Sequence, residues 1–74
     1  MNSRQKYNLA RAVNKLKDSY KDKVIDYEVD DNRKRRCDDA LVYLYVNEDI
    51  YLITLNTEDL RIINNIYDVL EKFI

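Results

Sequence analysis

The residues with the most evident chemical potential form a short basic run, Arg33, Lys34, Arg35 and Arg36. Consecutive cationic side chains can bind phosphates, serve as a nuclear localisation signal or clamp an acidic protein. Four aspartates flank the run and bring residues 30–39 to a net charge of zero: Asp30, Asp31, Asp38 and Asp39. This balance argues against strong nucleic-acid binding. We therefore interpret the run as a solvated loop or hairpin tip, with a functional basic tip as the alternative.

Nucleophilic, acid–base and metal chemistry lack their usual parts in this sequence. Cys37 is the only cysteine and there is no histidine, so Cys37, Ser3 and Ser19 have no histidine base to activate them. One cysteine cannot supply a structural zinc site. Glycine is also absent, which excludes Gly-rich phosphate loops, dinucleotide turns and nucleophile elbows. We therefore expect a protein that is not an enzyme and that uses no cofactor and no metal.

Length and charge bound the class of protein further. The 74 residues are enough for one domain, which we place over residues 1–74, and a core of this size is marginal. The net charge of −1 hides an asymmetry, because residues 1–36 hold eleven basic and six acidic residues whereas residues 37–74 hold two and eight. Halves of opposite sign argue against a simple nucleic-acid binder, which is usually basic overall.

Two amphipathic helices should position these groups. In the first, residues 4–22, apolar residues recur at helical spacing, and Asn2 or Ser3 can cap the start. The second begins at residues 56–59, where Thr57 or Asn56 can cap and two acidic residues suit the helix dipole. It is predicted to run to residue 74 with a wide buried stripe: Leu60, Ile63, Ile66, Tyr67, Leu70 and Ile74, broadened by Ile62, Val69 and Phe73.

Three strands are predicted between the helices, at residues 24–29, 40–46 and 50–55. The connection at residues 47–49 is far too short for a parallel crossover, so the strands should form an antiparallel meander. Asn and Asp in that connection tolerate the turn geometry that glycine would otherwise supply. The predicted fold is α+β, in the order helix, three-stranded antiparallel meander, helix (αβββα), with both helices packed on one sheet face.

One face of this sheet has no further element to cover it. A two-residue turn within residues 47–49 places five apolar residues of the second and third strands on that face: Leu41, Tyr43, Tyr45, Ile50 and Leu52. A contiguous apolar and aromatic patch usually marks an interface, and tyrosine suits one. We predict that these residues bind a protein partner. The alternative is that the helices split, one on each side of the sheet, so that both faces are core.

Charged residues form a further candidate contact at one end of the domain. The start of the second strand should lie beside the end of the third, which gathers four carboxylates: Asp38, Asp39, Glu58 and Asp59. Such a cluster could imitate phosphates or bind a hard cation. We favour helix capping and solvated surface as the explanation.

The outer face of the first helix carries basic residues with an aromatic one: Arg4, Tyr7, Arg11 and Lys15. This combination could meet nucleic acid. Asp18 and Asp22 interrupt the basic face on the following turns, so we favour a solvated helix surface.

The small size, the abundance of Asn, Ile, Lys and Tyr, and the helix–three-strand–helix order over residues 4–73 resemble some small phage-encoded anti-CRISPR proteins. Proteins of that kind typically block a host nuclease by occupying its nucleic-acid or nucleotide site. The resemblance implies a non-catalytic inhibitor of a host defence or nucleic-acid enzyme, of phage or mobile-element origin. The acidic end or the face that carries Tyr43 and Tyr45 would make the contact.

Two other functions remain as alternatives. The first is a small nucleic-acid-binding regulator, monomeric or dimeric, that uses the first helix and residues 33–36. The second is a structural homodimer, joined through the uncovered sheet face or through Ile62, Val69 and Phe73. Residues 1–6 lead into no apolar signal segment, no apolar run approaches the ~20 residues that span a bilayer, and a lone cysteine fits a reducing compartment. We therefore expect a cytoplasmic protein with no membrane partner.

Overall fold

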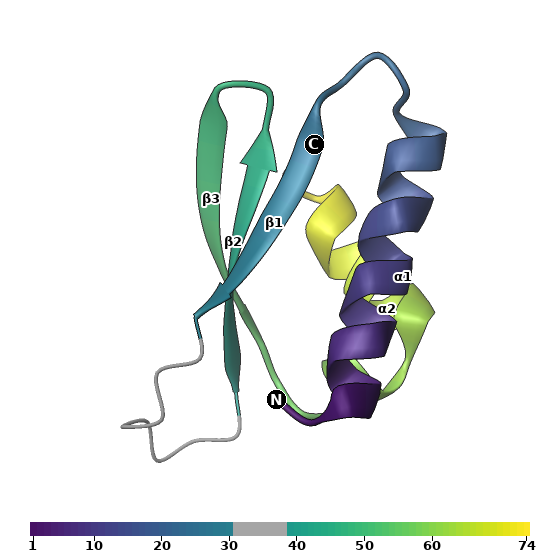
Figure 1. Ribbon diagram of the computed structural model, residues 1–74, viewed down its shortest axis with the longest axis vertical. Helices are drawn as coiled ribbons and strands as arrows, with labels where there is room; N and C mark the ends of the chain where they lie inside the picture. The colour runs from purple at the N-terminus through teal and green to yellow at the C-terminus, as the bar shows by residue number, and fades with distance from the viewer. Residues whose placement is uncertain (31–38) are drawn as a thin grey trace.

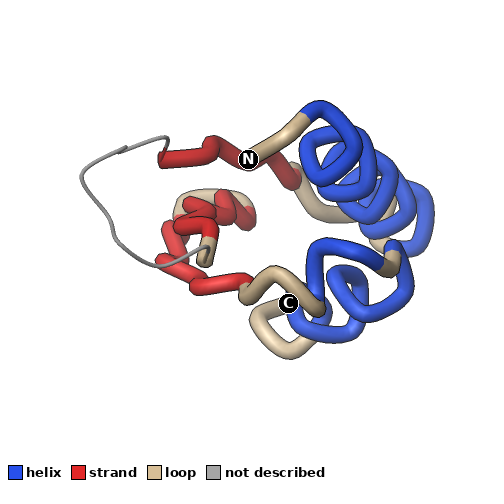
Figure 2. The backbone as a smooth tube through the Cα atoms, turned by 90° about the horizontal axis from the view of Figure 1, so that it is seen from below, coloured by secondary structure: helices blue, strands red, loops and turns tan. Residues whose placement is uncertain are grey.

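The computed structural model describes residues 1–30 and 39–74. Its elements are α1 (Ser3–Ser19), β1 (Ile25–Asp30), β2 (Ala40–Val46), β3 (Asp49–Leu55), a 3₁₀ turn η1 (Asp59–Arg61) and α2 (Ile63–Glu71). The strands form one antiparallel sheet in the order β1-β2-β3. Both helices lie on the same side of that sheet (Figure 1), and the end-on view in Figure 2 separates a layer of strands from a layer of helices. The predicted αβββα fold is confirmed.

Helix α1 begins with a reciprocal cap. Asn2 Oδ1 accepts a hydrogen bond from the backbone N of Gln5 at 2.8 Å, and Gln5 Oε1 accepts one from the backbone N of Asn2 at 3.0 Å. This pair satisfies two backbone amides that the first helical turn leaves without partners. The helix ends at Ser19, three residues before the predicted end, because the chain turns at Tyr20–Lys23 to enter β1.

The β2–β3 hairpin turns at Asn47 and Glu48, since Val46 pairs with Asp49. Asn47 has a φ of 55°, a left-handed conformation that Asn tolerates better than most residues. Its backbone N donates to the carbonyl oxygen of Val24 at 2.7 Å, and its Oδ1 accepts from the backbone N of Val24 at 3.0 Å. The turn residue therefore also ties the hairpin to the residue before β1, which helps to set the register of all three strands.

The core lies between the sheet and the two helices. It takes one apolar stripe from each helix and alternate residues from each strand, because side chains on one face recur about every 3.6 residues in a helix and every two in a strand. The buried residues of this cluster are Leu9, Ala12, Val13, Leu16, Ile25, Ala40, Val42, Leu44, Val46, Ile53, Leu55, Leu60, Ile66 and Leu70. None of the helices in the described residues is long and apolar enough to span a membrane.

The prediction of one continuous helix from residue 56 onward is wrong. At Ile62 the chain is extended (φ −128°, ψ 121°), so η1 and α2 are separate. The carbonyl oxygen of Leu60 accepts a hydrogen bond from Asn8 Nδ2 at 2.9 Å. In a continuous helix that carbonyl would accept from the amide four residues later. Two β-branched residues followed by two asparagines, at residues 62–65, give the helix little local support, so the contact with α1 prevails.

Candidate functional site

The side of the sheet away from the helices carries three cross-strand rows of side chains, which we call the open face. Each row takes one residue from β1, one from β2 and one from β3. The rows are Asp26–Tyr45–Ile50, Glu28–Tyr43–Leu52 and Asp30–Leu41–Thr54. Along the strands, the same residues form three columns, which are acidic on β1, mainly aromatic on β2 and mainly aliphatic on β3.

The five residues predicted to bind a partner all lie on the open face, but they differ in how much surface they offer. Ile50 is 62% exposed and Leu52 is 58% exposed. The tyrosines beside them, Tyr43 and Tyr45, are half-buried. Leu41 is only 7% exposed, although it lies outside the main core cluster. A partner could therefore reach four of the five residues, with β3 supplying most of the apolar surface.

The acidic column stands directly beside the tyrosines. Tyr45 Oη donates a hydrogen bond to Glu28 Oε2 at 3.2 Å, and Asp26 Oδ1 accepts one from the backbone N of Tyr27 at 2.8 Å. The pKa of Tyr45 is raised above its usual value by desolvation, and then by the hydrogen bond to Glu28 and the negative charges of Glu28 and Asp26. The carboxylates therefore create a negative potential over this edge of the open face.

The charge of the open face has a single sign in the part of the chain that the structure describes. Three carboxylates lie on β1, and none of the nine residues in the three rows is a lysine or arginine. An anionic, aromatic and aliphatic surface repels phosphates but suits a protein surface that combines Lys or Arg with apolar residues. The open face therefore combines one sign of charge with exposed apolar side chains.

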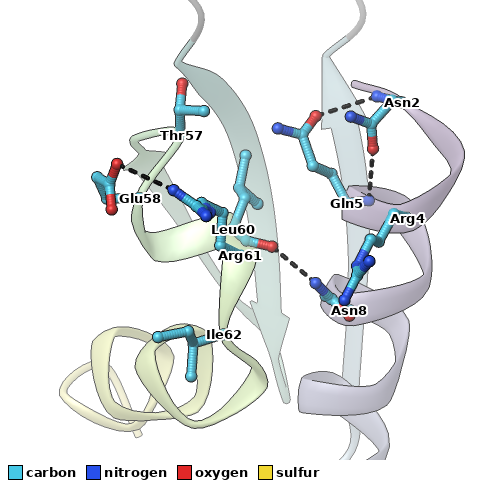
Figure 3. A pocket seen from close by; sticks show the side chains of 9 residues that line it. All are labelled: Asn2, Arg4, Gln5, Asn8, Thr57, Glu58, Leu60, Arg61 and Ile62. Carbon is cyan, nitrogen blue, oxygen red and sulfur yellow. Dashed lines mark hydrogen bonds and ion pairs between the residues drawn. The ribbon is translucent and has the colours of Figure 1, made fainter.

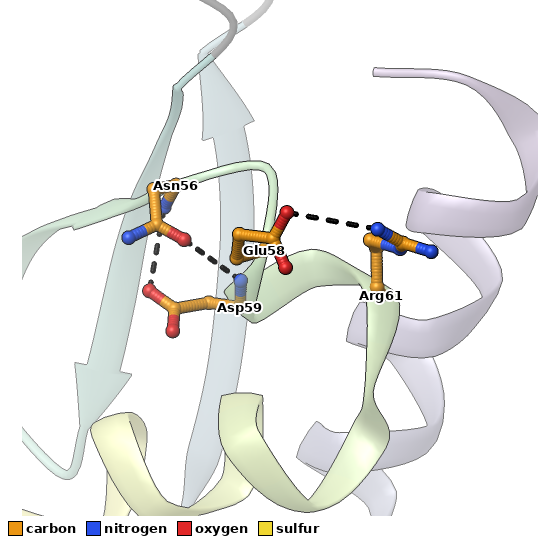
Figure 4. Close-up of polar contacts among 4 residues, drawn as sticks. All are labelled: Asn56, Glu58, Asp59 and Arg61. Atoms are coloured by element: carbon orange, nitrogen blue, oxygen red, sulfur yellow. Dashed lines mark hydrogen bonds and ion pairs between the residues drawn. The ribbon is translucent and has the colours of Figure 1, made fainter.

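The remaining predicted charged residues are placed differently. The basic run at residues 33–36 and Asp38 lie outside the described residues. Asp59 and Asn56 exchange hydrogen bonds in the turn that leads into η1. Asn56 Oδ1 accepts from the backbone N of Asp59 at 2.7 Å, and Asp59 Oδ2 accepts from the backbone N of Asn56 at 3.4 Å (Figure 4). Glu58 pairs with Arg61 at 3.6 Å. Over residues 1–30 and 39–74, no three acidic or cysteine side chains lie close enough together to hold a metal ion.

The third predicted contact, the flank of the second helix, is mostly used inside the protein. Val69 and Phe73 pack against the core, and the Phe73 ring lies 5.5 Å from the Tyr51 ring between centroids. Ile62 is 53% exposed, so its predicted place in the buried stripe is wrong. The flank therefore contributes one exposed apolar residue.

Asn8 is a structural residue that the sequence analysis missed. It is buried between α1 and η1, where its amide holds the Leu60 carbonyl (Figure 3). A signal for it exists, because Asn8, Ala12 and Leu16 recur every four residues and all three are buried. A polar residue in such a stripe indicates a buried hydrogen bond.

No protein-family model, no curated protein and no solved structure matches this chain.

Proposed function

We propose that this protein is a non-catalytic binding module whose open face docks on a protein partner that presents apolar residues beside lysines or arginines. The observation that carries the proposal is the exposure of Ile50 and Leu52 next to two tyrosines and a column of carboxylates. Exposed apolar patches are costly in water and usually serve an interface. Tyrosine adds a large contact area with a polar end that tolerates exposure in the free protein.

The partner class follows from the sign of the charge. The acidic residues of β1 are spaced two apart, so their side chains repeat at about 6.6–6.8 Å along the strand on one side of the sheet. A column of regularly spaced negative charges complements the cationic surface with which an enzyme holds nucleic acid. The proposed partner is therefore a nucleic-acid-processing enzyme, such as a host nuclease of the kind that anti-CRISPR proteins block. The protein would act as an inhibitor by covering that surface.

The test compares two variants with equal changes in charge. Ile50→Asp with Leu52→Asp alters the open face, whereas Tyr7→Asp with Asn65→Asp alters exposed residues on the helical layer. All four side chains are exposed, so both variants should keep the fold, as far-ultraviolet circular dichroism can verify. A partner captured from the cognate cell should be lost with the open-face variant and retained with the helical-layer variant. The purified partner should be a nucleic-acid enzyme that the wild-type protein inhibits.

Three results would contradict the proposal. Equal capture by both variants would place the interface elsewhere. A wild-type dimer in analytical ultracentrifugation that the open-face variant converts to a monomer would assign the face to a second copy. Direct binding of DNA or RNA that weakens steeply with salt would favour a nucleic-acid-binding regulator.

A further inference from the structure

A second surface of opposite charge lies on the helical layer. Two adjoining depressions, with volumes of about 780 and 660 Å³, run between α1 and the η1–α2 segment. Both are lined by Arg4, Asn8, Arg61 and Ile62, so they form one groove, whose first part is drawn in Figure 3. The groove shares no residue with the open face, and its function would be independent of the one proposed above.

The shape of the groove depends on the break between η1 and α2. The hydrogen bond from Asn8 Nδ2 to the Leu60 carbonyl fixes η1 against α1. The chain is extended at Ile62, and the Ile62 side chain stays 53% exposed. Ile62 lines both depressions. The buried hydrogen bond between Asn8 and Leu60 therefore helps to present the apolar side chain of Ile62 in a mainly polar groove.

The lining is mainly cationic. Four basic residues line the groove, Arg4, Arg11, Lys15 and Arg61, against the two acidic residues Glu58 and Asp18. Their internal partners are weak or neutral, because Lys15 Nζ donates to Asn64 Oδ1 at 2.8 Å and the Arg61–Glu58 pair is well exposed at 3.6 Å. Within residues 1–30 and 39–74, the Arg4 guanidinium has no ion-pair or hydrogen-bond partner. These cations are available to an anionic ligand.

We propose that the groove binds an acidic peptide segment of a partner protein, with carboxylates on the basic side chains and one aliphatic residue against Ile62. Charge complementarity selects an anion, and Ile62 selects an apolar anchor among the acids. The lining residues in the described part of the chain include no aromatic ring. The rings of Tyr7 and Tyr67, which adjoin the groove, already contact Arg11 at 5.9 Å and Lys15 at 5.2 Å, so neither offers a free face toward the groove cations for a base to stack on. The chemistry therefore favours a peptide over single-stranded nucleic acid.

The probe is an acetylated, amidated peptide of sequence Asp-Glu-Leu-Ile-Asp-Glu, titrated into the 74-residue chain and followed by amide chemical shifts. Its control is Asn-Gln-Leu-Ile-Asn-Gln, which keeps the aliphatic residues and loses the charge. The acidic peptide should bind more tightly than the neutral one, with the largest shifts at Arg4, Asn8, Arg61 and Ile62. The shifts should be absent from the open face.

Substitutions distinguish binding in the groove from a general effect of the net charge of the protein. Arg4→Gln with Arg61→Gln should weaken binding of the acidic peptide by about fivefold to tenfold, as expected for two exposed ion pairs. Lys17→Gln with Lys21→Gln removes the same charge from exposed positions outside the groove and should leave the affinity nearly unchanged. All four side chains are exposed, so the fold should tolerate both variants.

Each contrary outcome overturns the proposal in a distinct way. Equal binding of the acidic and neutral peptides, or an equal loss in both double variants, would show that no acid-selective groove exists. Tighter binding of an oligothymidylate at the same residues would assign the groove to nucleic acid. Self-association that depends on Arg4 and Arg61 would assign it to a second copy of this chain. None of these results bears on the open face, so the two proposals can fail separately.

Discussion

The two faces of the sheet are built from alternate residues of the same three strands, yet the helices cover only one of them. On β2 the faces are similarly apolar, with Val42 and Leu44 toward the helices and Tyr43 and Tyr45 away from them. The faces differ on β1, where Ile25, Tyr27 and Val29 alternate with three carboxylates. The helices cover the side on which all three strands are apolar.

The difference shows how the residues of one edge strand can determine which side of a sheet becomes the core. Burying a carboxylate costs far more than leaving an isoleucine or leucine in water. Three acidic residues on β1 therefore exclude the helices from the open face, even though the tyrosines and β3 would suit a core. We propose that the same acids leave that face for a partner that brings compensating cations.

The largest effect should separate matched leucines on the two faces. Leu44 is fully buried beneath the helices, so Leu44→Ala should lower the free energy of unfolding by about 2–5 kcal/mol. Leu52 is exposed on the open face, so Leu52→Ala should change it by no more than about 0.5 kcal/mol. Urea denaturation followed by circular dichroism measures both. A similar loss in the two variants would mean that the open face is covered in solution.

The hairpin turn should have the next largest effect, because a slip of one residue would exchange the two faces of β3. Asn47→Ala removes both the tolerance of a positive φ and the side-chain bond to the amide of Val24, and should cost about 1–3 kcal/mol in the free energy of unfolding. Asn47→Gly keeps the backbone freedom and loses only the side-chain bond. Its cost in the same urea experiment should be smaller, and equal costs would remove the role assigned to the positive φ.

Removing the acids should change association more than folding. With Asp26→Leu and Glu28→Leu, two of the three rows on the open face become apolar from edge to edge, and we expect the protein to self-associate. Asp22→Leu with Glu48→Leu makes the same change in composition at exposed acids off the open face and should stay as dispersed as the wild type. Sedimentation velocity over a concentration series compares them. Equal behaviour of the two variants would show that the β1 acids do not protect the open face.

The smallest effect concerns the ionisation of Tyr45. Its pKa is raised from the ordinary 10.0 by desolvation first and by Glu28 second, so Glu28→Gln should lower the pKa only part of the way back. A raised pKa means that folding favours the neutral phenol. Its contribution to stability is present below the unfolded pKa and is lost as the pH rises through the folded one. Carbon-13 tyrosine NMR, with Tyr45→Phe for assignment, measures the shift. An unchanged pKa in Glu28→Gln would show that Glu28 does not raise the pKa of Tyr45.

Local patterns in the sequence predict most of the fold. Period-two alternation and a short polar connection give β2 at residues 40–46 and the antiparallel register of the hairpin, and the structure confirms both. The same alternation places Tyr43, Tyr45, Ile50 and Leu52 on one face. The αβββα order then follows, since two amphipathic helices and a three-stranded meander have few ways to share one core.

Contacts between distant segments decided the rest. The helical period of residues 60–74 continues through the break at Ile62, and only the low helix propensity of residues 62–65 points to it. The hydrogen bond that holds the Leu60 carbonyl comes from Asn8, which is 52 residues away. The burial of Leu41 and the groove between α1 and η1 are likewise properties of assembled elements.

The sequence by itself determined the elements, the register of the hairpin and the side of each strand on which a residue lies, because these depend on periodicity along the chain. Only the tertiary structure separated η1 from α2, and it decided between the predicted packing of both helices on one sheet face and the alternative of one helix on each face. Those choices depend on comparing burial and hydrogen-bond free energies across the whole molecule, where carboxylates on β1 and one asparagine on α1 outweigh local preference.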